Sequence, residues 1–167
     1  MTNYVTRTAT TDDETGLDAL LSASYSTLMK PAYSETLSED ALQLMTKSNP
    51  TLLASGTFYV AEAEDSMLVG CGGWTIERPG DGKVEDGVGH VRHFATHPDW
   101  VGRGIGQAIY ALCETNAGAA GVTVFECFSS LNAERFYASL GFARVRETDV
   151  ELTTGVTVPG IVMRRRI

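Results

Sequence analysis

The chain has 167 residues, of which 43% are hydrophobic and 20% are charged, and its formal net charge at pH 7 is −8. This length and composition are typical of one soluble globular domain, spanning residues 1–167, whose core needs neither disulfides nor a structural metal. The acidic balance argues against nucleic acid and anionic membranes as partners, since both are bound by neutralising many phosphates with Lys and Arg. It favours a cationic substrate instead.

The chain carries no mark of membrane insertion or export. No window approaches the ~20 consecutive apolar residues of a transmembrane helix. Residues 1–7 lack the charged head and the apolar stretch of a secretory signal, so we expect a cytoplasmic protein. Cys71, Cys113 and Cys127 lie in apolar surroundings without metal-ligand or C-x-x-C spacing, which indicates buried free thiols.

Hydrophobic periodicity predicts elements in the order β-α-α-β-β-β-α-β-α-β-β, which indicates the α/β (α+β) class. The expected strands are 4–8, 57–63, 67–77, 90–96, 122–128, 143–152 and 160–166. The first expected helix follows a capping box at Thr11 and Glu14, and the second runs through 37–45. The third begins near Gly104, and the fourth runs through 132–140. The strand, helix and strand between 90 and 128 imply a right-handed crossover with parallel pairing. We therefore expect one mixed β-sheet of about seven strands flanked by about four helices.

Helical spacing also predicts which side chains the first two helices bury. The first helix should bury Leu17, Leu20, Leu21 and Ser24, and the second Leu37, Ala41, Leu44 and Met45. Residues 29–34, between these helices, are expected to form a loop. The C-terminal run of Arg164, Arg165 and Arg166 is interpreted as a solvated strand end.

A glycine-rich loop with Gly102, Gly104 and Gly106 connects the strand 90–96 to the third helix. The first backbone N–H groups of a helix lack intrahelical partners, and the helix dipole adds partial positive charge, so this end favours a phosphate. Glycines allow close approach of a pyrophosphate, and Arg103 adds a fork of donors. The spacing fits neither the dinucleotide fingerprint G-x-G-x-x-G nor the phosphate-loop string G-x-x-x-x-G-K-[ST]. A glycine-rich turn without a ligand is the alternative, and His97 beside Pro98 is interpreted as part of the turn.

Two motifs resemble the GNAT superfamily of N-acetyltransferases, over nearly the whole chain. The family's acyl-CoA loop Q/R-x-x-G-x-G/A falls on residues 101–106 and departs only at Val101, and its N-x-x-A-x-x-F-Y-x-x-L-G-F signature resembles residues 132–142 with the alanine shifted. The resemblance implies the GNAT fold and acetyl-CoA as co-substrate. It also implies that the strand backbone pairs with the pantetheine arm. The residues it assigns to acetyl-CoA are Phe94, Ala95, Thr96, Val101, Gly102, Arg103, Gly104, Ile105, Gly106, Gln107, Asn132 and Tyr137.

The implied reaction is direct acetyl transfer to a primary amine in a ternary complex, without a metal. The resemblance gives Tyr137 the role of protonating the departing thiolate, and strand amides near Phe94 could hold the oxyanion. The protonated amine needs a base, for which His90 and His93 are candidates and Glu126 is a third. Each of the two histidines has the alternative of a structural or surface role.

The resemblance places the acceptor site between segments 25–36 and 153–160, with Tyr25, Met29 and Tyr33 as candidate lining residues. The acceptor itself stays open between a small molecule and an amine of a peptide or protein. A non-catalytic acyl-CoA-binding regulatory module and a protein-interaction domain are the rival classes. A homodimer formed by edge pairing of the C-terminal strands is compatible with the sequence.

Overall fold

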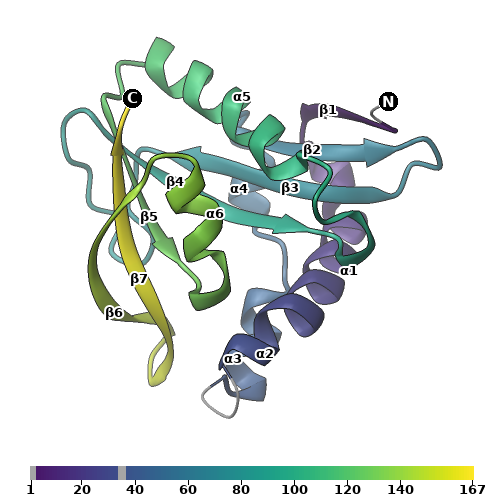
Figure 1. The fold of residues 1–167 in the computed structure, drawn as a ribbon, viewed down its shortest axis with the longest axis horizontal. Helices are drawn as coiled ribbons and strands as arrows, with labels where there is room; N and C mark the ends of the chain where they lie inside the picture. Colours follow the sequence, from purple (N-terminus) through teal and green to yellow (C-terminus); the bar gives the residue numbers. More distant parts are fainter. Residues whose placement is uncertain (1–2, 34–36) are drawn as a thin grey trace.

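A seven-stranded mixed β-sheet, in the order β1-β2-β3-β4-β5-β7-β6, runs through the protein in the computed structural model, which describes residues 3–33 and 37–167 (Figure 1). The strands are β1 Tyr4–Thr8, β2 Phe58–Ala63, β3 Leu68–Thr75, β4 Val88–Thr96, β5 Val124–Ser129, β6 Ala143–Thr153 and β7 Val156–Arg166. Neighbouring strands pair antiparallel except β4 and β5, which are parallel. The predicted mixed sheet and its parallel crossover are confirmed.

The helices lie on both faces of this sheet, with α5 and α6 on the near face in Figure 1 and α1 and α4 behind it. They are α1 Glu14–Ser24, α2 Lys30–Tyr33, α3 Glu39–Met45, α4 Pro50–Leu53, α5 Ile105–Ala119 and α6 Glu134–Ser139. Shorter turns are η1 Thr11–Asp13, the π-helical η2 Tyr25–Met29, η3 Pro98–Trp100 and η4 Leu131–Ala133. Over the described ranges, none of the helices has the length and apolarity to cross a membrane.

Three clusters of buried side chains form the core. Ile109 of α5 and Phe125 of β5 belong to the first, on the α5 and α6 face. Leu21 of α1 and Val60 of β2 belong to the second, on the opposite face. The third lies where α2 and α3 meet the β6–β7 hairpin, and includes Tyr33. All three cysteines are buried and free as predicted, and burial raises the pKa of Cys71 to about 12.

The helical region before β2 differs from the prediction in several places. The capping box is one residue earlier, because the Thr10 N–H donates to the Asp13 carboxylate at 2.8 Å. The predicted inward face of α1 is confirmed, since all four of its residues are buried. Leu44, expected inside, is 42% exposed, because the short helix α3 has space for few inward positions. The helix α4 was not predicted; it starts at Pro50, with the Asn49 side chain capping its first amides.

The prediction of a loop over residues 29–34 is wrong for residues 29–33, which are helical. Ser34 lies outside the described residues. The helix continues through η2 and α2 because Met29 and Tyr33, one helical turn apart, are 1% and 2% exposed and pack in the third cluster. Pro31 cannot donate a backbone hydrogen bond, and the turn before it is π-wound, with the Lys30 N–H bonded to the Tyr25 carbonyl.

The C-terminal arginines are not a freely solvated run. The Arg164 Nε lies 2.7 Å from the Glu126 carboxylate, and the Arg165 guanidinium lies 3.3 Å from the Glu114 carboxylate. Only Arg166 is exposed among the three. The ladder between β5 and β7 explains this, because it brings these side chains over carboxylates that are distant in sequence.

Candidate active site

The two central strands separate halfway along the sheet. β4 and β5 pair only from Val88 to His90, opposite Val124 to Glu126, after which β4 remains with β3 and β5 with β7. At the same point β4 bulges: the pairing with β3 shifts register, and His93 has a φ of +51°. The bulge reorients the strand, and side chains beyond His90 reach a space between the two halves of the sheet.

That space is a cavity of about 370 Å³, a size typical of small-ligand sites. Its walls come from β4, the end of β5, α6, the π-helical turn with α2 and α3, and the β6–β7 hairpin. The lining includes Tyr25, Met29, Tyr33, Arg92, His93, Phe94, Phe128, Ser129, Tyr137, Glu151 and Val158. The cavity therefore lies at the place where the central strands of the sheet diverge.

Tyr137 lines this cavity from α6. Its ring packs edge-on against Phe136, Phe142 and Phe94, with centroids 5.2, 5.5 and 6.2 Å apart. Burial raises the pKa of its hydroxyl well above the usual value, so the group is protonated at neutral pH. Within the described part of the chain no protein group hydrogen-bonds this hydroxyl, which leaves it available as a donor to a ligand.

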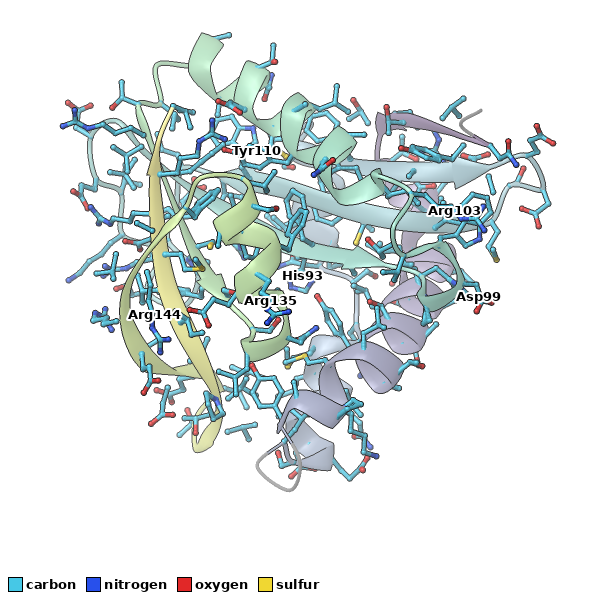
Figure 2. The ribbon with its side chains drawn as sticks, in the orientation of Figure 1. His93, Asp99, Arg103, Tyr110, Arg135 and Arg144 are labelled. Atoms are coloured by element: carbon cyan, nitrogen blue, oxygen red, sulfur yellow. The ribbon has the colours of Figure 1, made fainter. Side chains whose placement is uncertain are left out.

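His93 lines the same cavity from the bulge of β4. Its burial and the neighbouring Arg92 cation lower the pKa of its imidazole from 6.5 to about 4, so the ring is neutral at pH 7. A neutral imidazole has a free lone pair and can accept a proton. In Figure 2 His93 lies near the centre of the molecule, whereas Asp99 and Arg103 lie beyond the end of β4.

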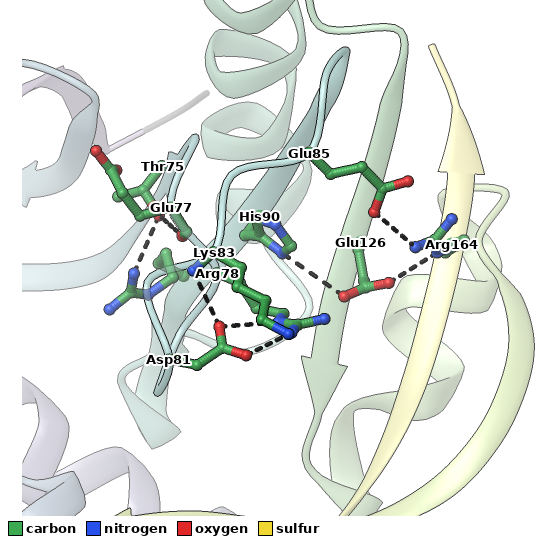
Figure 3. A network of polar contacts seen from close by, with 10 residues as sticks. Thr75, Glu77, Arg78, Asp81, Lys83, Glu85, His90, Glu126 and Arg164 are labelled. Atoms are coloured by element: carbon green, nitrogen blue, oxygen red, sulfur yellow. Dashed lines mark hydrogen bonds and ion pairs between the residues drawn. The ribbon is translucent and has the colours of Figure 1, made fainter.

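His90 and Glu126, the other two candidate bases, are not among the residues that line the cavity. They face each other across the parallel pair of strands, with His90 Nδ1 3.7 Å from the Glu126 carboxylate (Figure 3). Arg164 bonds the same carboxylate and reaches Glu85 at 3.6 Å. Burial lowers the pKa of His90. The structure thus joins this pair to a polar network rather than to Tyr137.

The glycine loop takes the conformation that a helix-terminal anion site requires. Gly102 and Gly104 have φ values of +82° and +77°, which L side chains rarely adopt, and Gly104 caps α5. The first intrahelical bond runs from the Ala108 N–H to the Gly104 carbonyl at 3.0 Å. The amides of Ile105, Gly106 and Gln107 therefore have no intrahelical acceptor.

The remaining side chains assigned to acetyl-CoA differ in what they offer. Ile105 is buried in the first core cluster, and a Cβ on Gly106 would lie 2.8 Å from the Phe136 ring, so Gly106 is required for the packing of α5 against α6. Val101 is exposed. The Arg103 guanidinium stacks on Trp100 at 4.4 Å. Ile105 can therefore contribute only its backbone amide.

Three other predicted residues lie outside the cavity lining, namely Ala95, Thr96 and Asn132. Ala95 is buried in the second core cluster, and Asn132 is exposed in η4, the turn before α6. His97 belongs to the turn as predicted, because its Nδ1 accepts a hydrogen bond from the Asp99 N–H at 3.2 Å.

Tyr25, Met29 and Tyr33 line the cavity from the helical side, as the sequence predicts. The Tyr33 hydroxyl donates to the Pro159 carbonyl at 2.7 Å and accepts from the Leu131 N–H at 3.0 Å, and so connects three walls. Arg92 was missed by the sequence analysis. The signal in the sequence that could have found it is a permanently charged side chain within residues 91–95 of a strand, where the other residues are apolar, aromatic or histidine.

Comparison with known proteins gives one family. A family model described as "Acetyltransferase (GNAT) domain" matches residues 54–144. A GCN5-related N-acetyltransferase from Rhodopseudomonas palustris is 21% identical with a TM-score of 0.77, covering 100% of this chain and 98% of that one. The PaiA N-acetyltransferase from Thermoplasma acidophilum, solved with coenzyme A, is 17% identical with a TM-score of 0.70, covering 99% and 100%. A search of curated protein sequences finds no match.

A family match over more than half of the residues and this shared fold define the class. The chain belongs to the GNAT acetyltransferase family, and the resemblance predicted from the sequence is confirmed.

Proposed function

We propose that this protein is an N-acetyltransferase that moves an acetyl group from acetyl-CoA to a primary amine by direct transfer. The observation that carries the proposal is the cavity between the diverging strands, whose lining holds both a protonated tyrosine hydroxyl, from Tyr137, and a neutral imidazole, from His93. Family membership supports the acetyl donor.

The residues present fit acetyl-CoA. Free amides at the start of α5, in a loop that Gly102 and Gly104 hold at positive φ, are suited to the pyrophosphate. The edge of β4 beyond His90, which has no partner from β5, is suited to the amide groups of the pantetheine arm. Acetyl-CoA supplies a thioester carbonyl and a thiol leaving group of ordinary acidity.

The roles of the chain's own residues follow from their protonation states. His93 has a neutral ring, so it accepts the proton that the amine nitrogen loses as it attacks, directly or through a water molecule, and then releases this proton to solvent. A bond forms between the amine nitrogen and the acetyl carbon, the carbon–sulfur bond breaks, and its electron pair leaves with sulfur. Tyr137 donates its proton to this thiolate and regains one from solvent. The products are an acetylated amine and a free thiol.

Calorimetric titration with acetyl-CoA, followed by a free-thiol assay over a panel of amines, tests this function. Binding with amine-dependent thiol release is the expected result. Binding without release on any amine would favour the alternative, a non-catalytic acyl-CoA-binding regulatory module. Absence of binding would overturn the interpretation of the glycine loop. Dimerisation along β6, an edge strand, and a cytoplasmic location stay predictions.

A further inference from the structure

We propose that the acceptor is a free apolar amino acid whose carboxylate is bound by Arg92 while its amine is acetylated beside His93. This inference rests on the proposed function and names its substrate class. It revises the expectation from net charge, which favours a cationic acceptor. The charge of the whole chain does not describe the charge of the cavity.

Among the residues that the structure describes, Arg92 is a cation without a carboxylate partner. Its Nη1 donates to the Thr75 hydroxyl at 3.0 Å, and no described acidic group lies within 4.0 Å of its guanidinium. Glu77 favours its charge only from a longer distance, and burial lowers its pKa. Six of the other nine arginines, in contrast, form an ion pair or stack on an aromatic ring; Arg7, for example, pairs with Asp13. A half-buried guanidinium with free donors is suited to a carboxylate from a ligand.

The other charges around the cavity are few. Among its described lining residues, Glu151 is the one acidic group, and it is exposed on β6, in the hairpin. His93 is neutral at pH 7. A cationic ligand would therefore be repelled by Arg92, and the solvated Glu151 carboxylate is the one acidic lining group that could offset this repulsion. A ligand carboxylate would instead be attracted by the Arg92 guanidinium.

The spacing of the two groups favours an α-amino acid. Arg92 and His93 are consecutive residues of the bulge, and both line the cavity. In an α-amino acid the amine and the carboxylate are attached to the same carbon, so neighbouring protein groups can bind both. In a peptide the carboxylate lies further from the terminal amine, and Arg92 would remain unpaired.

The rest of the lining selects an apolar side chain. Tyr25, Met29, Phe128, Leu152 and Val158 come from three different walls and present mainly aromatic and aliphatic surface. Burial of such a side chain is enough to discriminate an apolar amino acid from glycine by at least about 10-fold.

The experiment compares L-phenylalanine, L-phenylalaninamide and phenethylamine, which share a ring and differ at the carboxylate. Rates of thiol release are corrected for thioester hydrolysis and expressed per deprotonated amine, because the amide has the lower amine pKa. We expect kcat/KM for the amino acid to exceed both others by about 10- to 100-fold, the range for a charge-assisted hydrogen bond. Leucine and methionine should be accepted, and glycine and spermidine should be poor substrates.

Variants separate recognition from folding. Arg92→Gln should lower kcat/KM for L-phenylalanine by about 10- to 100-fold more than kcat/KM for phenethylamine, a selective loss that general loss of structure would not produce. Arg92→Lys should restore part of the preference. Arg146→Gln, at an exposed arginine of β6 outside the cavity, is the matched control and should keep the preference.

The outcomes distinguish the two proposals. Equal or higher rates with the amide, with phenethylamine or with spermidine would refute the amino acid acceptor and leave the acetyltransferase standing. A preference for the amino acid that survives in Arg92→Gln would also refute the role of Arg92. Failure of every amine together with failure to bind acetyl-CoA would refute the proposed function itself.

Discussion

Replacing His93 with asparagine should change how the stability of the protein depends on pH. Burial and the Arg92 cation lower the pKa of His93 from 6.5 to about 4 in the folded protein, whereas the unfolded chain keeps the ordinary value. Asparagine does not titrate, and it tolerates the φ of +51° at this position better than most residues. The variant therefore removes the titration with little backbone strain.

The sign follows from proton binding. Between pH 6.5 and about 4 the unfolded chain binds a proton that the folded protein excludes, so acid favours unfolding in this range. The contribution is complete above about pH 6.5, falls as the pH drops and levels off below about 4. At ~1.4 kcal/mol for each tenfold change in proton affinity, the total loss is about 3 kcal/mol, of which about 2 kcal/mol is lost by pH 5.

Urea denaturation of both proteins, from about pH 7 to about pH 4.5, measures this contribution. His90, whose pKa is also lowered by burial, is present in both, so it cancels in the difference between the two free energies of unfolding. The wild type should lose about 2.4 kcal/mol relative to His93→Asn over this range. Parallel curves would show that His93 is solvated in the folded protein, and its assignment as a neutral base in the cavity wall would fail.

Three further substitutions test other parts of the site. Tyr137→Phe should lower kcat by about 10- to 1000-fold with nearly unchanged affinity for CoA, as steady-state kinetics and calorimetry would show; unchanged turnover would remove its hydroxyl from the mechanism. Gly104→Ala should strain the positive φ by about 1 kcal/mol and weaken CoA binding, while Gly118→Ala, an exposed helical control, should leave the Kd unchanged; equal Kd values for both would place the pyrophosphate elsewhere. Gly106→Ala should destabilise the protein by about 1–3 kcal/mol through its contact with Phe136, and a thermal melt equal to that of the wild type would contradict this packing.

The sequence predicts the order of the elements along the chain and the glycine loop because both depend on local signals. Alternation over β2 and β3, the break at Pro98 and the helix start at Gly104 are each set within a few residues. The same holds for the inward face of α1. The prediction of buried positions from helical spacing fails in α3 because that helix is short. It has seven residues, and in such a short helix the spacing of Leu44 does not determine which side faces the core.

The choice among the candidate bases could not be made from the sequence, because it depends on one bulge. His90 and His93 lie on the same strand, and alternation alone says only which residues share a face. The positive φ of His93 arises where β4 leaves β5, which is a property of tertiary pairing. The partner that holds His90, Glu126, lies 36 positions away on another strand, at a register that no local pattern encodes.

The insertion of β7 between β5 and β6 has a consequence for partial unfolding. Among the described strands, β6 pairs with β7 alone, so the β6–β7 hairpin, closed by a tight turn at Gly155, can detach as one unit. Detachment would leave the β5 backbone from Val124 to Ser129 unpaired along one side and uncover Cys127. Such an edge is open to a hairpin from another molecule, so exchange of this hairpin between two chains is the form of dimer that the topology favours under mild denaturation.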